Sequence, residues 1–141
     1  MFGCGFHLNF KELLYSEGLV NVCSFINKTS EILNKKFKYI IYDNGCKMSK
    51  HINGNKNDYP FLADTICLID RFHIKNHKPE CFKHYNTKDI ETLAKINSQV
   101  CEQSNFKLNI HKHATKHMTE AGYHFFFINL WQFKNTNKYD I

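Results

Sequence analysis

The sequence has no apolar run long enough to cross a bilayer. The longest, residues 124–131, is far shorter than the ~20 residues that a membrane-spanning helix needs. The first ten residues also lack a basic segment, a continuous apolar stretch and a small-residue cleavage site, so we expect no secretory signal. These absences predict a protein that is neither membrane-spanning nor secreted.

Arginine is almost absent, because the 19 basic residues are all lysines except Arg71. The formal net charge of +6 is compatible with binding a phosphate backbone. Reading bases, by contrast, relies heavily on bidentate guanidinium contacts, which this chain has little means to make. The charge therefore permits nucleic acid as a partner without predicting sequence-specific reading.

The cysteines form no dense framework. They stand apart at positions 4, 23, 46, 67, 81 and 101. Without a signal for an oxidising compartment, we expect reduced thiols. The length of 141 residues with 43% hydrophobic residues predicts one compact domain, residues 1–141, with a real core.

The stretch KYIIYDNGC, residues 38–46, predicts a buried strand at about 37–43 that ends at a carboxylate. Its β-branched and aromatic run is followed by the turn formers Asp43, Asn44 and Gly45. Ligands collect at the carboxyl ends of strands in an open α/β sheet. Asp43 is therefore the first candidate site residue.

A second apolar run, TICLIDRFH, predicts a strand at about 65–71 that ends at Asp70, with His73 three positions further on. Apolar residues at helical spacing precede the first strand, from about residue 17 to 33. A short helix is expected between the strands, after Gly45. This alternation predicts an α/β fold in which the two strands are parallel neighbours, with the other edge of the first strand left unpaired.

The remaining expected elements are a strand or hairpin arm at 1–7, a loop at 76–86, a short helix at 87–95, a long helix from Asn97 and a final helix at about 119–133. The loop is expected because it holds Pro79 and many polar groups. One face of the long helix carries a polar row made of Ser98, Glu102, Asn105 and Asn109.

Four segments in order, YDNGCK, IDRFHIKNHKPEC, INSQVCEQSN and HMTEAGYHFFF, resemble the C-terminal half of the catalytic domain of KDZ (Kyakuja, Dileera, Zisupton) transposases. The resemblance runs from about residue 2 to 131. It implies an RNase H-like DDE core related to hAT-type transposases, here a truncated fold with a short, mainly parallel sheet and long C-terminal helices. It also implies DNA as a partner and a nuclear location.

The resemblance assigns Asp43 as the second catalytic Asp and Glu102 as the helix-borne catalytic Glu. Asp70 and His73 match the (Cys or Asp)-x-x-His motif that follows the second Asp. The family's first strands and first catalytic Asp have no counterpart here, so the resemblance implies a fragment or relic that is inactive unless an upstream segment or another chain supplies them. The alternative is a non-catalytic DNA-binding or zinc-stabilised interaction module.

DNA strand cleavage and transfer of this kind use two divalent cations about 4 Å apart. Mg²⁺ and Mn²⁺ prefer carboxylate oxygens, which makes Asp43 and Glu102 the candidate ligands. The competing interpretation is structural, since an Asp at a strand end often closes a turn or caps a helix.

His73, His77 and Cys81 follow the spacing His-x3-His-x3-Cys, and either Cys46 or Cys101 could complete a tetrahedral zinc set. The sequence favours another interpretation. In it, His73 caps a strand end or orients a carboxylate, and Cys81 is a small buried apolar group.

Overall fold

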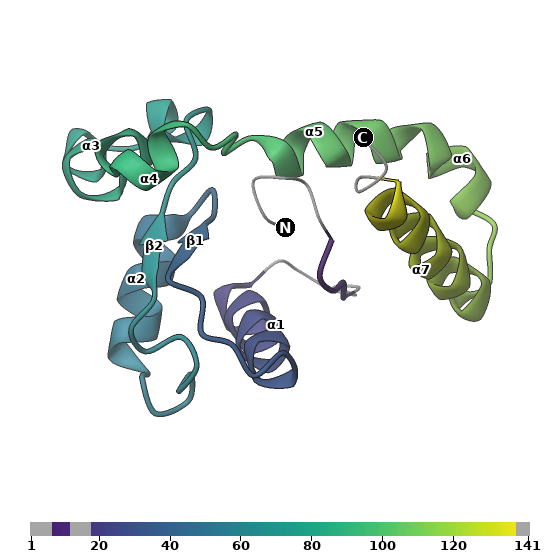
Figure 1. The fold of residues 1–141 in the computed structure, drawn as a ribbon, viewed down its shortest axis with the longest axis horizontal. Helices are drawn as coiled ribbons and strands as arrows, with labels where there is room; N and C mark the ends of the chain where they lie inside the picture. The colour runs from purple at the N-terminus through teal and green to yellow at the C-terminus, as the bar shows by residue number, and fades with distance from the viewer. Residues whose placement is uncertain (1–6, 12–17, 138–141) are drawn as a thin grey trace. The chain divides into compact units, whose positions relative to one another are not determined.

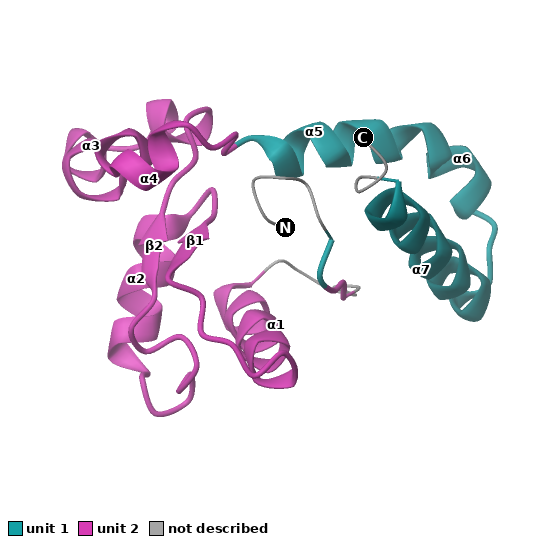
Figure 2. Ribbon diagram, in the orientation of Figure 1, with its two compact units in different colours: residues 1–8, 99–141 teal, residues 9–98 magenta. Residues whose placement is uncertain are grey.

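The computed structural model describes residues 7–11 and 18–137, which belong to two compact units. Unit 2 is residues 9–98 and unit 1 is residues 99–141 together with 1–8 (Figure 2). The arm expected at 1–7 lies outside the described residues except for His7. A single domain over 1–141 stays a prediction.

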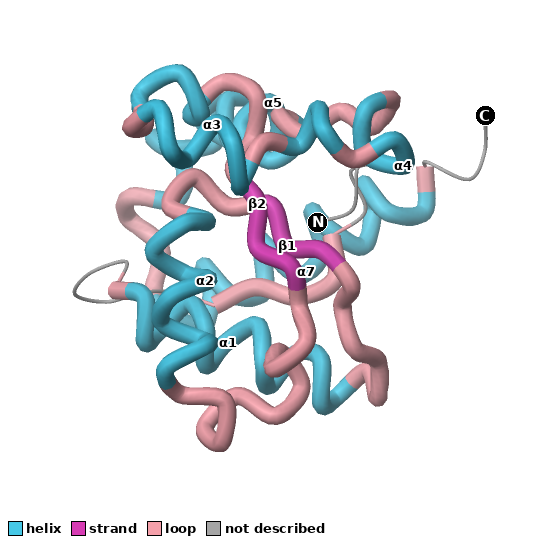
Figure 3. The backbone as a smooth tube through the Cα atoms, turned by 90° about the vertical axis from the view of Figure 1, so that its left-hand side faces the viewer, coloured by secondary structure: helices cyan, strands magenta, loops and turns pink. Residues whose placement is uncertain are grey.

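Unit 2 is built on two parallel strands, β1 (Tyr39–Ile41) and β2 (Ile66–Leu68), which lie side by side in Figure 3. The register pairs Tyr39 with Ile66, Ile40 with Cys67 and Ile41 with Leu68. The predicted parallel pairing is confirmed, although both strands are shorter than expected. Among the described residues β1 pairs with β2 alone, so its other edge carries no strand, as expected.

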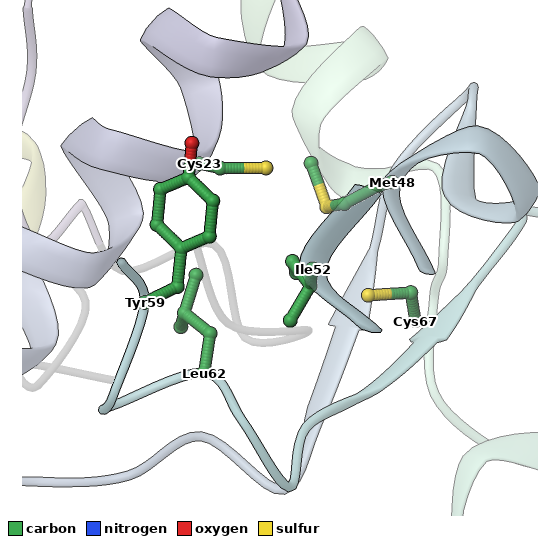
Figure 4. Packing of buried hydrophobic residues seen from close by; sticks show 6 residues of the cluster. All are labelled: Cys23, Met48, Ile52, Tyr59, Leu62 and Cys67. Atoms are coloured by element: carbon green, nitrogen blue, oxygen red, sulfur yellow. The ribbon is translucent and has the colours of Figure 1, made fainter. Parts of the chain in front are cut away.

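Two helices and the connection before β2 supply the core beside this sheet (Figure 4). They are α1 (Leu19–Ile32), which matches the predicted helix, and α2 (Gly45–Gly54). The buried side chains are Cys23 on α1, Met48 and Ile52 on α2, Tyr59 and Leu62 in the connection, and Cys67 on β2. This packing fixes the helix that begins directly after the Asp43 turn.

After β2 the chain forms short helices, and the loop expected at 76–86 is wrong. The segments are η1 (His73–Asn76), α3 (Pro79–Tyr85), η2 (Thr87–Asp89) and α4 (Glu91–Ala94). Pro79 stands at the first position of α3, where its missing N–H costs nothing, with Glu80 in the first turn. The exit of α3 then returns to the sheet, where the Ile69 amide donates to the Tyr85 carbonyl at 2.8 Å.

Unit 1 contains α5 (Val100–Leu108), η3 (Asn109–His111), α6 (Lys112–Thr115) and α7 (Glu120–Thr136), all labelled or traceable in Figure 1. The long helix expected from Asn97 begins three residues later and tightens to a 3₁₀ turn at η3. The final helix is confirmed, and its N-cap Thr119 accepts a hydrogen bond from the Gly122 amide at 3.2 Å. No helix in the described part of the chain is both long and apolar enough to span a membrane.

His7 ties the two ends of unit 1 together. The Asn135 side chain accepts from the His7 amide at 2.9 Å and donates to the His7 carbonyl at 2.7 Å. The His7 ring also stacks on Trp131, with the ring centroids 5.5 Å apart. These contacts join segments 128 residues apart in the sequence.

Candidate metal centre

Asp43 lies at the carboxyl end of β1, in the turn that leads into α2. Its Oδ1 accepts a hydrogen bond from the Asn44 amide at 2.7 Å, and the Gly45 amide donates to the Tyr42 carbonyl at 3.0 Å. The carboxylate therefore takes part in the local turn, as the structural interpretation expects. It is half-buried, and the described residues donate no hydrogen bond to its Oδ2. One oxygen thus orders the turn while the other remains available for a cation.

Asp70 takes the equivalent position after β2, and its environment is more closed. Only 8% of its side chain is exposed. Oδ1 accepts from the amides of Phe72 at 2.7 Å and His73 at 3.0 Å, and Oδ2 lies 2.6 Å from His73 Nδ1. This network closes the turn that starts η1. His73 therefore contacts a carboxylate at a strand end, as the structural interpretation predicted.

Three other sulfur and nitrogen donors come together between α2 and α3. Cys46 stands near the start of α2, His77 lies between η1 and α3, and Cys81 lies within α3. Cys46 Sγ is 3.6 Å from His77 Nδ1, and the three donor atoms all lie within 4.8 Å of one another. Two thiols and an imidazole at this spacing could hold a metal ion such as zinc.

Of the two cysteines that the sequence offered beside His77 and Cys81, Cys46 lies in this group. Cys101 is exposed and belongs to unit 1, so its relation to this group stays open. His73 is not part of the group, and its Nδ1 contacts Asp70 instead. Cys81 is half-exposed, so its interpretation as a buried apolar group is wrong.

The surroundings of Cys81 disfavour its thiolate form when no metal is bound. Burial raises the pKa of the Cys81 thiol, and its hydrogen bond and charge interaction with Cys46 raise it further. The charge of Glu80 acts in the same direction, whereas Lys50 lowers this pKa. Sequence reasoning did not single out Lys50, although its position four residues after Cys46 on α2 was a signal that could have found it.

Glu102, the second candidate carboxylate, lies in the first turn of α5 and is exposed. It belongs to unit 1 and Asp43 to unit 2. Their convergence on one divalent-ion site therefore stays a prediction.

The family model of the Kyakuja-Dileera-Zisupton (KDZ) transposases matches residues 4–135, nearly the whole chain. The chain belongs to the KDZ transposase family. Neither the curated proteins nor the solved structures contain a significant match to it. Membership of the KDZ family indicates a transposase-related origin and suggests a DNA-associated role. The Asp43 turn, the Asp70–His73 pair and the Cys46–His77–Cys81 group all lie within the matched KDZ segment.

Proposed function

We propose that this chain is a fragment or relic of a DDE transposase core with an RNase H-like fold. In this proposal Asp43 and Glu102 are ligands of Mg²⁺ or Mn²⁺, and the third carboxylate comes from a segment outside residues 1–141 or from another chain. The observation that carries the proposal is the KDZ family match over residues 4–135. Residues 1–141 alone then cut DNA poorly, because a two-metal site that lacks one carboxylate loses most of its transition-state stabilisation.

The position of Asp43 supports its assignment as a metal ligand. It follows β1 of a parallel pair, where the carboxyl ends of strands present their side chains at one edge of the sheet. Its partly exposed carboxylate has one oxygen engaged by the Asn44 amide. A hard cation can bind the other oxygen without breaking the turn.

Exposed lysines near the same end of the sheet support DNA as the partner. Lys47 and Lys50 lie on α2, and Lys83 lies on α3, a helix that contacts α2. Lysine ammonium groups neutralise phosphates without reading bases, in keeping with a chain that has a single arginine. We propose a nuclear, DNA-associated location on the same grounds.

Metal binding and cleavage can be tested together on residues 1–141. We expect Mn²⁺ to broaden the NMR signals of Asn44 and Gly45 selectively, and Asp43→Asn to abolish that broadening. Asp58→Asn, in an exposed turn, is the matched control and should leave it unchanged. We expect no Mn²⁺-dependent nicking of supercoiled DNA. Absence of selective broadening, or turnover that Asp43→Ala removes, would overturn this proposal.

DNA binding has a separate readout. Fluorescence anisotropy with a labelled duplex should give an affinity that falls steeply with salt concentration. Replacing Lys47 and Lys50 by glutamine should lower the slope of log K against log salt by about 1 for each phosphate that these ammonium groups neutralise. Lys28→Gln, on the exposed face of α1, should leave the slope unchanged.

The second candidate function is a non-catalytic DNA-binding or zinc-stabilised interaction module. The Cys46–His77–Cys81 group favours it, because a metal there would stabilise the fold without any carboxylate chemistry. Stoichiometric zinc together with salt-sensitive DNA binding, and no selective Mn²⁺ broadening at Asn44, would favour this module over the transposase core.

A further inference from the structure

We propose that Cys46, His77 and Cys81 bind one zinc ion that joins the connection after β1 to the connection after β2. The inference goes beyond the proposed DNA chemistry and does not depend on it. It rests on where the three donors lie: Cys46 follows the Asp43 turn, and the other two follow the Asp70 turn.

The donor spacing fits zinc closely. With Zn–S bonds of about 2.3 Å and Zn–N bonds of about 2.0 Å, the ligand atoms of a tetrahedral ion lie about 3.5 to 3.8 Å apart. The separation of 3.6 Å between Cys46 Sγ and His77 Nδ1 already meets this spacing. No pair within the group exceeds 4.8 Å, so a shift of about 1 Å at most completes the set.

The donor chemistry selects the kind of metal. Two thiols and one imidazole make a soft set that suits zinc, whereas Mg²⁺ and Mn²⁺ require oxygen ligands. Zinc binding would release the thiol protons and hold both sulfurs as thiolates. The zinc site is thus chemically distinct from the carboxylate site proposed at Asp43.

His73 is not placed in the fourth position, because neither of its ring nitrogens belongs to the group of donor atoms that lie within 4.8 Å of one another. With the three ligands that the described residues supply, water would occupy the fourth position of a tetrahedral ion. A disulfide between Cys46 and Cys81 is the competing product of this arrangement. A disulfide would not need an imidazole. The position of His77 Nδ1 beside Cys46 Sγ therefore favours a metal ion over a disulfide.

The zinc ion would bridge positions 31 residues apart and hold the start of α2 against α3. In doing so it would restrain the Asp43 turn, which lies three residues before Cys46. This consequence links the zinc to the proposed metal chemistry at Asp43, but the zinc itself can be tested without DNA.

The first test is metal content. The full chain, purified without a histidine tag in the presence of a reductant, should contain one zinc per chain by mass spectrometry. Cobalt exchanged for zinc should show thiolate-to-cobalt charge transfer and the strong visible bands of a tetrahedral ion. Cys46→Ser, His77→Ala and Cys81→Ser should each lose the zinc.

Two control variants match these substitutions. Cys101→Ser removes an exposed thiol of unit 1, and His84→Ala removes an exposed imidazole of α3 itself. Both should retain full zinc. Because a ligand variant could fail to fold, the cobalt spectrum of the unmodified chain decides independently. Absence of zinc with no tetrahedral cobalt spectrum, or a Cys46–Cys81 disulfide that persists under reductant, would overturn the proposal.

The second test addresses the cross-link. Hydrogen exchange should show that removing zinc with a chelator deprotects the peptide that covers residues 39–48. The peptide covering α7 in unit 1 should not change. We also expect Tm to fall by on the order of 5–10 °C on chelation. Stoichiometric zinc with unchanged exchange at 39–48 would overturn the cross-linking role, whereas loss of DNA binding alone would bear only on the proposed function.

Discussion

Gly45 lies directly against the main-chain carbonyl of Leu68. A Cβ at position 45 would sit 2.6 Å from the Leu68 carbonyl carbon and closer still to its oxygen. The same carbonyl accepts a hydrogen bond from the Tyr42 amide at 3.0 Å. The start of α2 is therefore pressed onto the end of β2, and this close approach sets where the intervening Asp43 turn lies.

We expect Gly45→Ala to be strongly destabilising, because the added methyl group meets backbone that has to move. Overpacking of this kind typically costs about 1–3 kcal/mol or more. Gly54→Ala at the other end of α2 is the matched control, since nothing lies within 4 Å of a Cβ there. It should change stability by no more than about 0.5 kcal/mol. Urea unfolding of both variants measures the difference, and equal midpoints would contradict this account.

Sequence patterns were sufficient for the sheet and its flanking helices. The apolar runs around Ile40 and Cys67 do form a parallel pair, although β1 is half-buried rather than buried as predicted. Sequence patterns were insufficient for α3, because the polar residues around Pro79 predict a loop there. That helix owes its position to a distant contact, because its last residue, Tyr85, accepts a hydrogen bond from Ile69 at the end of β2. Tertiary contacts of this kind leave no local trace in a sequence.

Asp70→Ala should destabilise unit 2 by about 1–3 kcal/mol, because the partly buried amides of Phe72 and His73 lose the acceptor that the buried Asp70 carboxylate supplies. Chemical denaturation with an unchanged m-value would measure this loss. Asp58→Ala, at an exposed turn, should cost no more than about 0.5 kcal/mol. If both variants unfolded at the same denaturant concentration, the hydrogen bonds of Asp70 would contribute nothing measurable to the free energy of unfolding.

The candidate metal centre was only partly visible in the sequence. The spacing His-x3-His-x3-Cys gives no reason to prefer one of its two histidines as a ligand. In the structure η1 ends at Asn76, and His77 has an extended backbone, with φ −96° and ψ 164°. That break turns His77 towards Cys46 while His73 stays with Asp70. Spacing alone could not separate the two histidines, since the separation depends on where one short helix stops.

Cys67 should resist alkylation in the native protein. Burial, followed by the charge of Cys23, raises the pKa of the Cys67 thiol from 9.0 to about 12. The reactive thiolate is therefore almost absent at pH 8. Iodoacetamide mapping by mass spectrometry should show labelling of the exposed Cys101 first, and labelling of Cys67 only after unfolding. Rapid labelling of Cys67 in the folded state would contradict this prediction.

The same thiol should make stability fall in alkali. Between about pH 9 and 12 the unfolded chain has lost the Cys67 proton while the folded chain retains it. The unfolded state then binds fewer protons, so the free energy of unfolding decreases as pH rises through this window. The contribution is fully present below pH 9. Cys67→Ala should show a shallower decline than the unmodified chain, and parallel pH profiles would refute the assignment.

The joint role of Asp43 and Glu102 can be tested by coupling, without assuming any arrangement of the two units. If both carboxylates bind one Mn²⁺ site, Asp43→Asn and Glu102→Gln should each remove most of the Mn²⁺ affinity measured by electron paramagnetic resonance. The double variant should then lose little more than either single variant, because residues that serve one site are not additive. Asp58→Asn should leave the affinity unchanged. Losses that simply add, or a Glu102→Gln variant that binds Mn²⁺ normally, would assign the two residues to different sites and remove Glu102 from the proposed transposase core.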